Sequence, residues 1–62
     1  MIPATVRSTA PNGDVIVVGD DGLFTTIPKS IVDASPFRLL RVGQRLAVAT
    51  SEGAPIAISL PS

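Results

Sequence analysis

Apolar and polar residues alternate along this chain in short stretches that are separated by turn sequences. Over residues 2–8 the two kinds of side chain alternate, which is the period of a half-buried strand. Residues 15–18 form a continuous β-branched run, which is too short for a helix and is typical of a central strand. Residues 23–27 alternate again, with Phe24 and Thr26 on one face. The first half of the chain therefore predicts three strands joined by glycine-containing turns.

Two more strands are predicted in the second half of the chain. Leu46 and Val48 face inward in the fourth strand, and a turn over residues 51–53 leads into a fifth strand over residues 55–60. The fifth strand also alternates, and we expect three of its side chains on the buried face: Ile56, Ile58 and Leu60. Pro61 ends this strand, because proline cannot donate a hydrogen bond to a neighbouring strand.

A long connection over residues 29–40 separates the third and fourth strands. Only residues 30–34 are suited to a helical turn, and we expect a short 3₁₀ segment there. Five short strands, one long connection and no amphipathic helix favour an all-β fold, a five-stranded antiparallel OB-type barrel with a long loop between the third and fourth strands. Residues 1–62 contain no repeat and no internal linker, so we expect a single domain.

The chain contains no cysteine and no histidine. It therefore lacks disulfides and the commonest protein ligands of transition metals, and its serines have no histidine base to activate them. Asp20 and Asp21 fall in a turn bounded by glycines, and a role in the turn explains them better than a metal site does. We expect no enzymatic activity, no metal and no cofactor.

Charge and hydrophobicity limit the classes of partner. Five basic and five acidic residues give a formal net charge of zero, so any affinity for nucleic acid must come from local patches. A hydrophobic fraction of 45% in 62 residues leaves apolar groups at the surface, which favours self-association or a partner surface. No apolar run approaches the ~20 residues that span a bilayer, and the N-terminus lacks a secretory pattern, so we expect a cytoplasmic protein without a membrane partner.

Residues 37–48, which read FRLLRVGQRLAV, resemble the end of the long loop and the fourth strand of cold-shock domains. The matching positions are Phe37, Arg38, Leu40, Gly43, Gln44, Arg45 and Leu46. Residues 5–7 look like the start of the first strand of that family, Gly13 sits at the first glycine of its first RNA-binding motif, and residues 55–57 fall in its fifth-strand region. The resemblance covers almost the whole chain and implies a cold-shock-like OB barrel.

Cold-shock domains bind single-stranded nucleic acid by stacking bases on aromatic side chains, and this chain has kept few of them. Ser8 stands at the tryptophan of the first strand, and residues 12–16 lack the aromatics of the first RNA-binding motif. Residues 23–26 take the place of the second motif and retain one aromatic. Because each stacked base contributes about 1–3 kcal/mol, we expect weak binding. The resemblance implies these contact residues: Arg7, Phe24, Thr26, Lys29, Phe37 and Arg38.

Three functions stay open. The first is a cold-shock-like module that binds single-stranded RNA or DNA weakly, and analogy with the family places it ahead. The second is a protein-interaction or self-association module, such as a homodimer, that has lost nucleic-acid binding and uses the same sheet face. The third is a structural barrel within a larger assembly, in which Phe24 and Phe37 only cover the hydrophobic surface. The contact surface of the second function consists of Ser8, Asp14, Ile16, Phe24 and Thr26.

Overall fold

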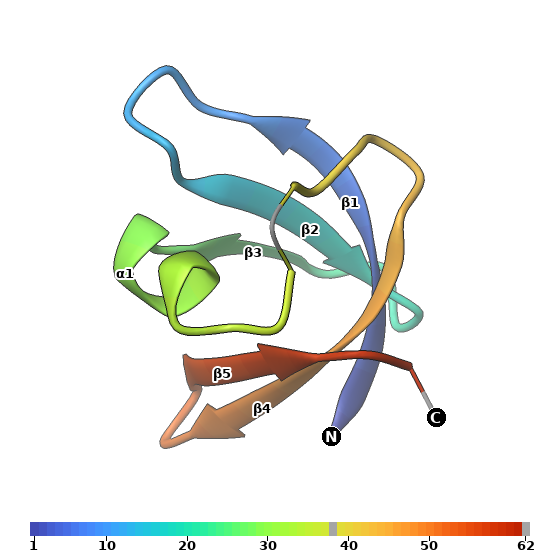
Figure 1. Cartoon of the computed structure of the whole chain (residues 1–62). Coiled ribbons are helices and arrows are strands. Elements are labelled where there is room, and N and C mark those ends of the chain that lie inside the picture. The colour runs from blue at the N-terminus through green and yellow to red at the C-terminus, as the bar shows by residue number, and fades with distance from the viewer. Residues whose placement is uncertain (38, 62) are drawn as a thin grey trace.

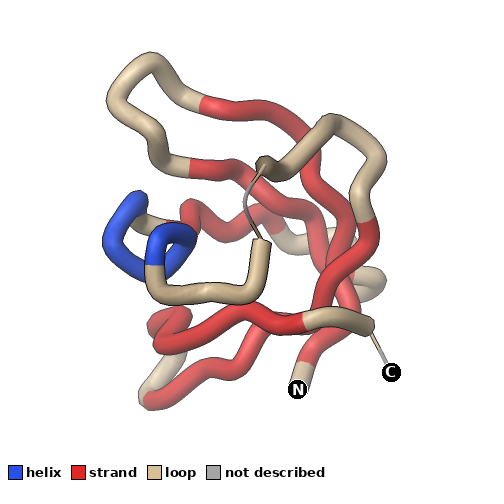
Figure 2. The backbone as a smooth tube through the Cα atoms, viewed as in Figure 1, coloured by secondary structure: helices blue, strands red, loops and turns tan. Residues whose placement is uncertain are grey.

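One antiparallel sheet forms the framework of the computed structural model, which describes residues 1–37 and 39–61. The elements are β1 (Ile2–Thr9), β2 (Val15–Gly19), β3 (Phe24–Ile27), α1 (Lys29–Asp33), β4 (Arg45–Ser51) and β5 (Ala54–Ser59). The strands follow the order β3-β2-β1-β4-β5, and the sheet curls into a half-barrel (Figures 1 and 2). The predicted all-β class with five antiparallel strands is confirmed, and the curled sheet is compatible with an OB-like barrel.

Strand β1 belongs to both halves of the sheet. Residues 2–5 pair with β4, and residues 4–9 pair with β2. The pairing with β2 shifts between Val6 and Ser8, so Arg7 is the extra residue of a β-bulge. Because a bulge bends its strand and increases the local twist, β1 can follow both neighbours around a common interior.

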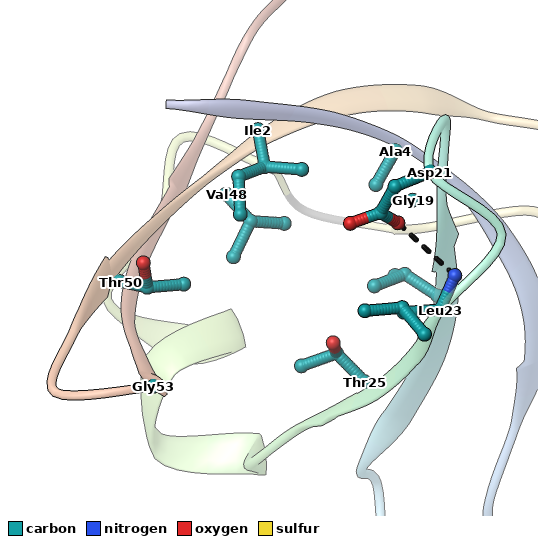
Figure 3. A pocket seen from close by; sticks show the side chains of 10 residues that line it. Ile2, Ala4, Gly19, Asp21, Leu23, Thr25, Val48, Thr50 and Gly53 are labelled. Carbon is teal, nitrogen blue, oxygen red and sulfur yellow. Dashed lines mark hydrogen bonds between the residues drawn. The ribbon is translucent and has the colours of Figure 1, made fainter.

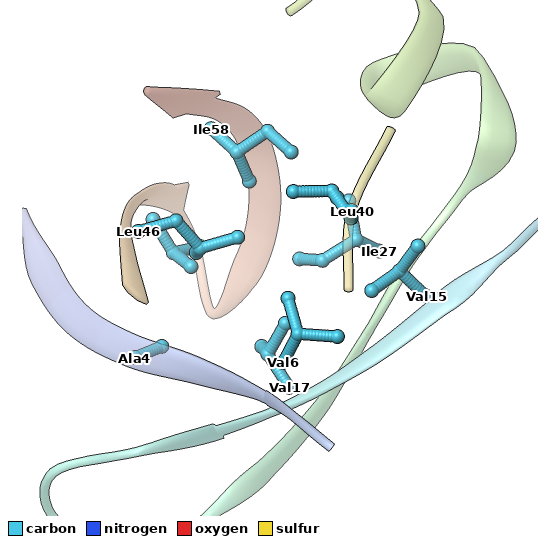
Figure 4. Close-up of a cluster of buried hydrophobic side chains, with 9 residues drawn as sticks. Ala4, Val6, Val15, Val17, Ile27, Leu40, Leu46 and Ile58 are labelled. Atoms are coloured by element: carbon cyan, nitrogen blue, oxygen red, sulfur yellow. The ribbon is translucent and has the colours of Figure 1, made fainter. Parts of the chain in front are cut away.

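The concave side of the sheet holds the hydrophobic core. Alternate residues of the strands point into it, and Leu40 joins them from the connection before β4 (Figure 4). Ile31, Val32 and Phe37 pack against this cluster from the same connection. Burying one large aliphatic side chain contributes about 1.5–3 kcal/mol, so this cluster is the main source of stability. It consists of Ala4, Val6, Val15, Val17, Ile27, Leu40, Leu46, Val48 and Ile58.

The connection after β3 contains an α-helix instead of the predicted 3₁₀ segment. The amides of Val32 and Ala34 each donate to the carbonyl four residues earlier, at 3.2 Å. Pro28 precedes the helix with φ −60° and ψ 149°, a position at which the missing amide of proline leaves nothing unsatisfied. Ile31 and Val32 lie one helical turn after Pro28, and their packing against the core favours the α-helical spacing.

Strand β5 buries one of the three side chains that alternation assigned to its inner face. Ile58 is buried, whereas Ile56 and Leu60 are 57% and 64% exposed. The pairing with β4 shifts between Ala49 and Thr50, so Ile56 is an extra residue that breaks the alternation. Leu60 follows the last residue of β5, and the strand no longer sets its direction. The prediction that Ile56 and Leu60 face inward was therefore wrong.

The contrast between Leu46 and Leu60 provides a test of this packing. Leu46 is fully buried, and Leu46→Ala is expected to lower the free energy of unfolding by about 2–5 kcal/mol through lost burial and the cavity that remains. Leu60→Ala removes the same atoms from an exposed position and is expected to change that free energy by less than about 0.5 kcal/mol. Urea denaturation followed by circular dichroism measures both values. Equal losses would contradict the surface position of Leu60.

Candidate nucleic-acid interface

The convex side of β1, β2 and β3 forms an open surface, which we call the outer face. Val15, Val17 and Ile27 point into the core, so their neighbours along each strand point the opposite way. The cross-strand register aligns these neighbours in two rows of three. The outer face consists of Thr5, Val18 and Phe24 in one row and Ser8, Ile16 and Thr26 in the other. All six side chains are uncharged.

Phe24 is the most prominent side chain of the outer face and is 65% exposed. It begins β3 directly after a tight hairpin, in which the Gly19 amide donates to the Leu23 carbonyl at 2.8 Å. Its partner across the strands is Val18, so the ring has an apolar neighbour on the same face. An exposed ring on a rigid strand is suited to stacking against another flat ring. Thr26, two residues later, shares this face and is also exposed.

Arg7 lies beside the outer face, at the bulge of β1. Arg7 directly precedes Ser8 in the strand and is exposed to solvent. Within residues 1–37 and 39–61 it forms no ion pair. Bulges often redirect a side chain away from the regular alternation. Of the predicted contact residues that the structure describes, Phe24 and Thr26 therefore lie on the outer face, and Arg7 lies beside it.

Lys29 and Phe37, which are also predicted contact residues, are placed differently. Lys29 Nζ lies 2.6 Å from Asp33 Oδ2, and the aliphatic stem of Lys29 packs so closely over Gly13 that a Cβ there would come within 2.7 Å of it. Phe37 is half-buried and packs against the core. Arg38 lies outside the described residues. The charge of Lys29 is thus locally compensated, and Phe37 serves as a cover for the core.

Asp14 connects the β1–β2 loop to the start of α1. Its Oδ1 accepts a hydrogen bond from the Lys29 amide at 2.9 Å, and its Oδ2 accepts one from Asn12 Nδ2 at 3.2 Å. The amide of Asp14 in turn donates to Asn12 Oδ1 at 3.0 Å. The first amides of a helix have no hydrogen-bond partner within the helix, and Asp14 supplies one for the amide of Lys29. The Asp14 side chain therefore joins the β1–β2 loop to the start of α1.

An ion pair between Arg45 and Asp20 borders the outer face. Arg45 Nη1 donates to Asp20 Oδ1 at 2.9 Å and Arg45 Nη2 donates to Asp20 Oδ2 at 3.1 Å, so the pair is bidentate. Arg45 Nη1 also donates to Thr5 Oγ1 at 3.0 Å. This guanidinium links β4 to β1 and to the β2–β3 turn. Nothing in the spacing of two residues 25 positions apart predicts such a pair.

The Asp20–Arg45 pair changes the acidity of both groups. Hydrogen bonds from Arg45 lower the pKa of the Asp20 carboxyl from its usual 3.8, and the nearby positive charge acts in the same direction. The pKa of the Arg45 guanidinium is raised by the same hydrogen bonds and charge. Both charges are therefore more strongly retained in the folded chain than in the unfolded chain.

This pair predicts a pH dependence in the acid range. A carboxyl with a lower pKa in the folded state stabilises the fold above its unfolded pKa, and that contribution is lost as the pH falls through the folded value. The NMR titration midpoint of the Asp20 carboxyl carbon is expected below 3.8 and is expected to rise towards 3.8 in Arg45→Leu. Arg41→Leu removes an equal charge away from Asp20 and serves as the control. An unchanged midpoint in Arg45→Leu would refute the pairing in solution.

No protein-family model, curated protein or solved structure matches this chain. Across residues 1–37 and 39–61 no three or more acidic side chains converge as metal ligands would. In the same part of the chain no helix has the length and apolar character needed to cross a membrane. The functional interpretation of the outer face therefore depends on its own geometry and on the resemblance in sequence.

Proposed function

We propose that this chain is a divergent cold-shock-like OB barrel that binds single-stranded nucleic acid weakly on its outer face. The connectivity supports this class of barrel, because β1, β2 and β3 follow one another, β4 returns to pair with β1, and β5 comes near β3. OB barrels bind oligonucleotides over the second and third strands and the adjoining loops. The outer face covers these two strands and β1.

The observation that carries the proposal is the exposure of Phe24 on that face. A large aromatic side chain that is 65% exposed in a chain with two phenylalanines provides a stacking surface for a base. Arg7, on β1, adds a cation beside the same face, and no described carboxylate neutralises it. Thr26 supplies a hydroxyl on the same strand, which can donate to or accept from a base edge or a phosphate.

The same geometry limits the affinity. One stacked base contributes about 1–3 kcal/mol, whereas a dissociation constant of 1 mM already corresponds to about 4 kcal/mol. Lys29 and Arg45 are each paired with an aspartate, so they add little attraction for phosphate. We therefore expect a dissociation constant of about 1 mM or weaker, with contacts to one or two phosphates.

Titration with a short single-stranded oligonucleotide tests this proposal. NMR amide shifts are expected to saturate over β1, β2 and β3, and Phe24→Ala is expected to weaken binding at least about fivefold, in line with the loss of one stacked base. Leu39→Ala is the matched control, because Leu39 is 68% exposed and apolar but lies in the loop before β4. With one or two phosphates contacted, the logarithm of the affinity should fall with the logarithm of salt at a slope of about −0.7 to −1.4.

Two results would overturn the proposal. The first is the absence of any saturable shift on the outer face at high oligonucleotide concentration. The second is an equal effect of Phe24→Ala and Leu39→Ala, which would indicate general apolar adhesion. Circular dichroism of both variants must show a folded chain, and because both side chains are exposed we expect no loss of structure.

A protein partner is the second candidate, because the described chain exposes many large apolar side chains. Phe24, Leu39, Val42, Ile56 and Leu60 are each more than half exposed, and Val18 and Ile16 extend the apolar area around Phe24. A net charge of zero imposes no long-range repulsion between copies. If the outer face mediates self-association, sedimentation equilibrium is expected to show a mass that rises with concentration and returns to that of one chain in Phe24→Ala. A constant monomer mass would exclude a homodimer.

A further inference from the structure

A cavity of about 170 Å³ opens on the concave side of the half-barrel, away from the outer face (Figure 3). Its inner wall is formed by the core residues Ala4, Val17 and Val48, and Ile2 and Leu23 form an apolar rim. Apolar cavities of about 150 Å³ are large enough to bind benzene. The volume therefore suits an apolar group of about one ring.

Asp21 places a carboxylate among the residues that line this cavity. Its Oδ1 accepts a hydrogen bond from the Leu23 amide at 3.0 Å, which fixes the side chain across the turn (Figure 3). The carboxylate lies so close to the backbone of Gly19 that a Cβ on that residue would come within 2.6 Å of Oδ1. Glycine at position 19 thus permits this orientation of Asp21.

The two neighbouring aspartates of the turn differ in their partners. Asp20 binds Arg45 through both carboxylate oxygens, whereas Asp21 forms no ion pair with another described residue. The second oxygen of Asp21 accepts no hydrogen bond within the described residues. Thr25 and Thr50, which also line the cavity, add hydroxyl groups that can accept further hydrogen bonds. The cavity therefore combines apolar walls with one negative charge and additional acceptors.

We propose that this cavity binds a small organic cation, namely a primary ammonium group carried on an apolar body of about one ring. The body fills the space lined by Ile2, Val17 and Val48, and the ammonium group donates to Asp21 and to a threonine hydroxyl. An ammonium has three donors and no acceptor, which matches a site that offers mainly acceptors. The Asp21 charge would repel an anion, and a neutral group would gain no ion-pair attraction from it.

Benzylammonium and its neutral analogue benzyl alcohol are suitable probes. In an NMR titration at constant chloride and neutral pH, benzylammonium is expected to shift the amides of Gly19, Leu23 and Thr25 saturably. It is also expected to bind about two- to fivefold more tightly than the alcohol, as an ion pair with an exposed carboxylate would give. Equal affinity for the two probes, or shifts that never saturate, would overturn the proposal.

Three variants assign the effect to the cavity. Asp21→Asn keeps an oxygen for the Leu23 amide and is expected to reduce the affinity for benzylammonium to that for benzyl alcohol. Glu52→Gln removes an equal negative charge from the β4–β5 turn without altering the cavity lining. It is expected to leave the ratio of the affinities for benzylammonium and benzyl alcohol unchanged. Thr50→Leu adds side-chain volume at an exposed position of the cavity lining and is expected to weaken the binding of both probes. A folded Asp21→Asn chain that keeps the preference for the amine would refute the role of Asp21.

Discussion

The double pairing of β1 is the constraint on which the other features of the fold depend. One strand pairs with β4 along its first part and with β2 along its second part, and the bulge at Arg7 allows it to bend between them. At this bend Val6 exchanges backbone hydrogen bonds of 2.9 Å with Gly43 and Gln44. Gly43 has φ 90°, a left-handed conformation that favours glycine, so the Gly-Gln pair anchors the turn before β4 to the shared strand. The bend gives the sheet its concave core and its convex outer face.

Alternation predicted the fold well wherever a strand is regular, and it failed where a residue is inserted. It placed Phe24 and Thr26 on one face of the third strand, and both are exposed as this requires. In the fifth strand the extra residue Ile56 interrupts the period of two, and no property of an isoleucine marks it as a bulge. The short helix was predicted as a 3₁₀ segment, whereas it is an α-helix. Its α-helical hydrogen bonds depend on the tertiary packing of Ile31 and Val32, which local propensity does not reveal.

The contact residues divide in a similar way. The face of Phe24 followed from its strand. The position of Phe37 depends on how residues 28–44, the connection between β3 and β4, fold back, and Phe37 packs on the core. The neutralisation of Lys29 by Asp33 follows a spacing of four residues, and it was detectable in principle once a helix was assumed. The position of Val18 on the outer face could not be predicted, because Val18 belongs to a continuous apolar run in which periodicity does not distinguish the two faces of a strand.

Local pairing of charges, more than their sum, decides what each surface attracts. In the two described ion pairs Asp33 compensates the charge of Lys29, and Asp20 compensates the charge of Arg45. Arg7 then remains beside the outer face, and Asp21 remains at the cavity. The molecule extends 25 × 21 × 20 Å, whereas charges at physiological ionic strength are screened over about 8 Å. A ligand at one surface therefore responds mainly to the charges next to it, so zero net charge is compatible with the two proposed sites, one for a polyanion on the convex side and one for a cation on the concave side.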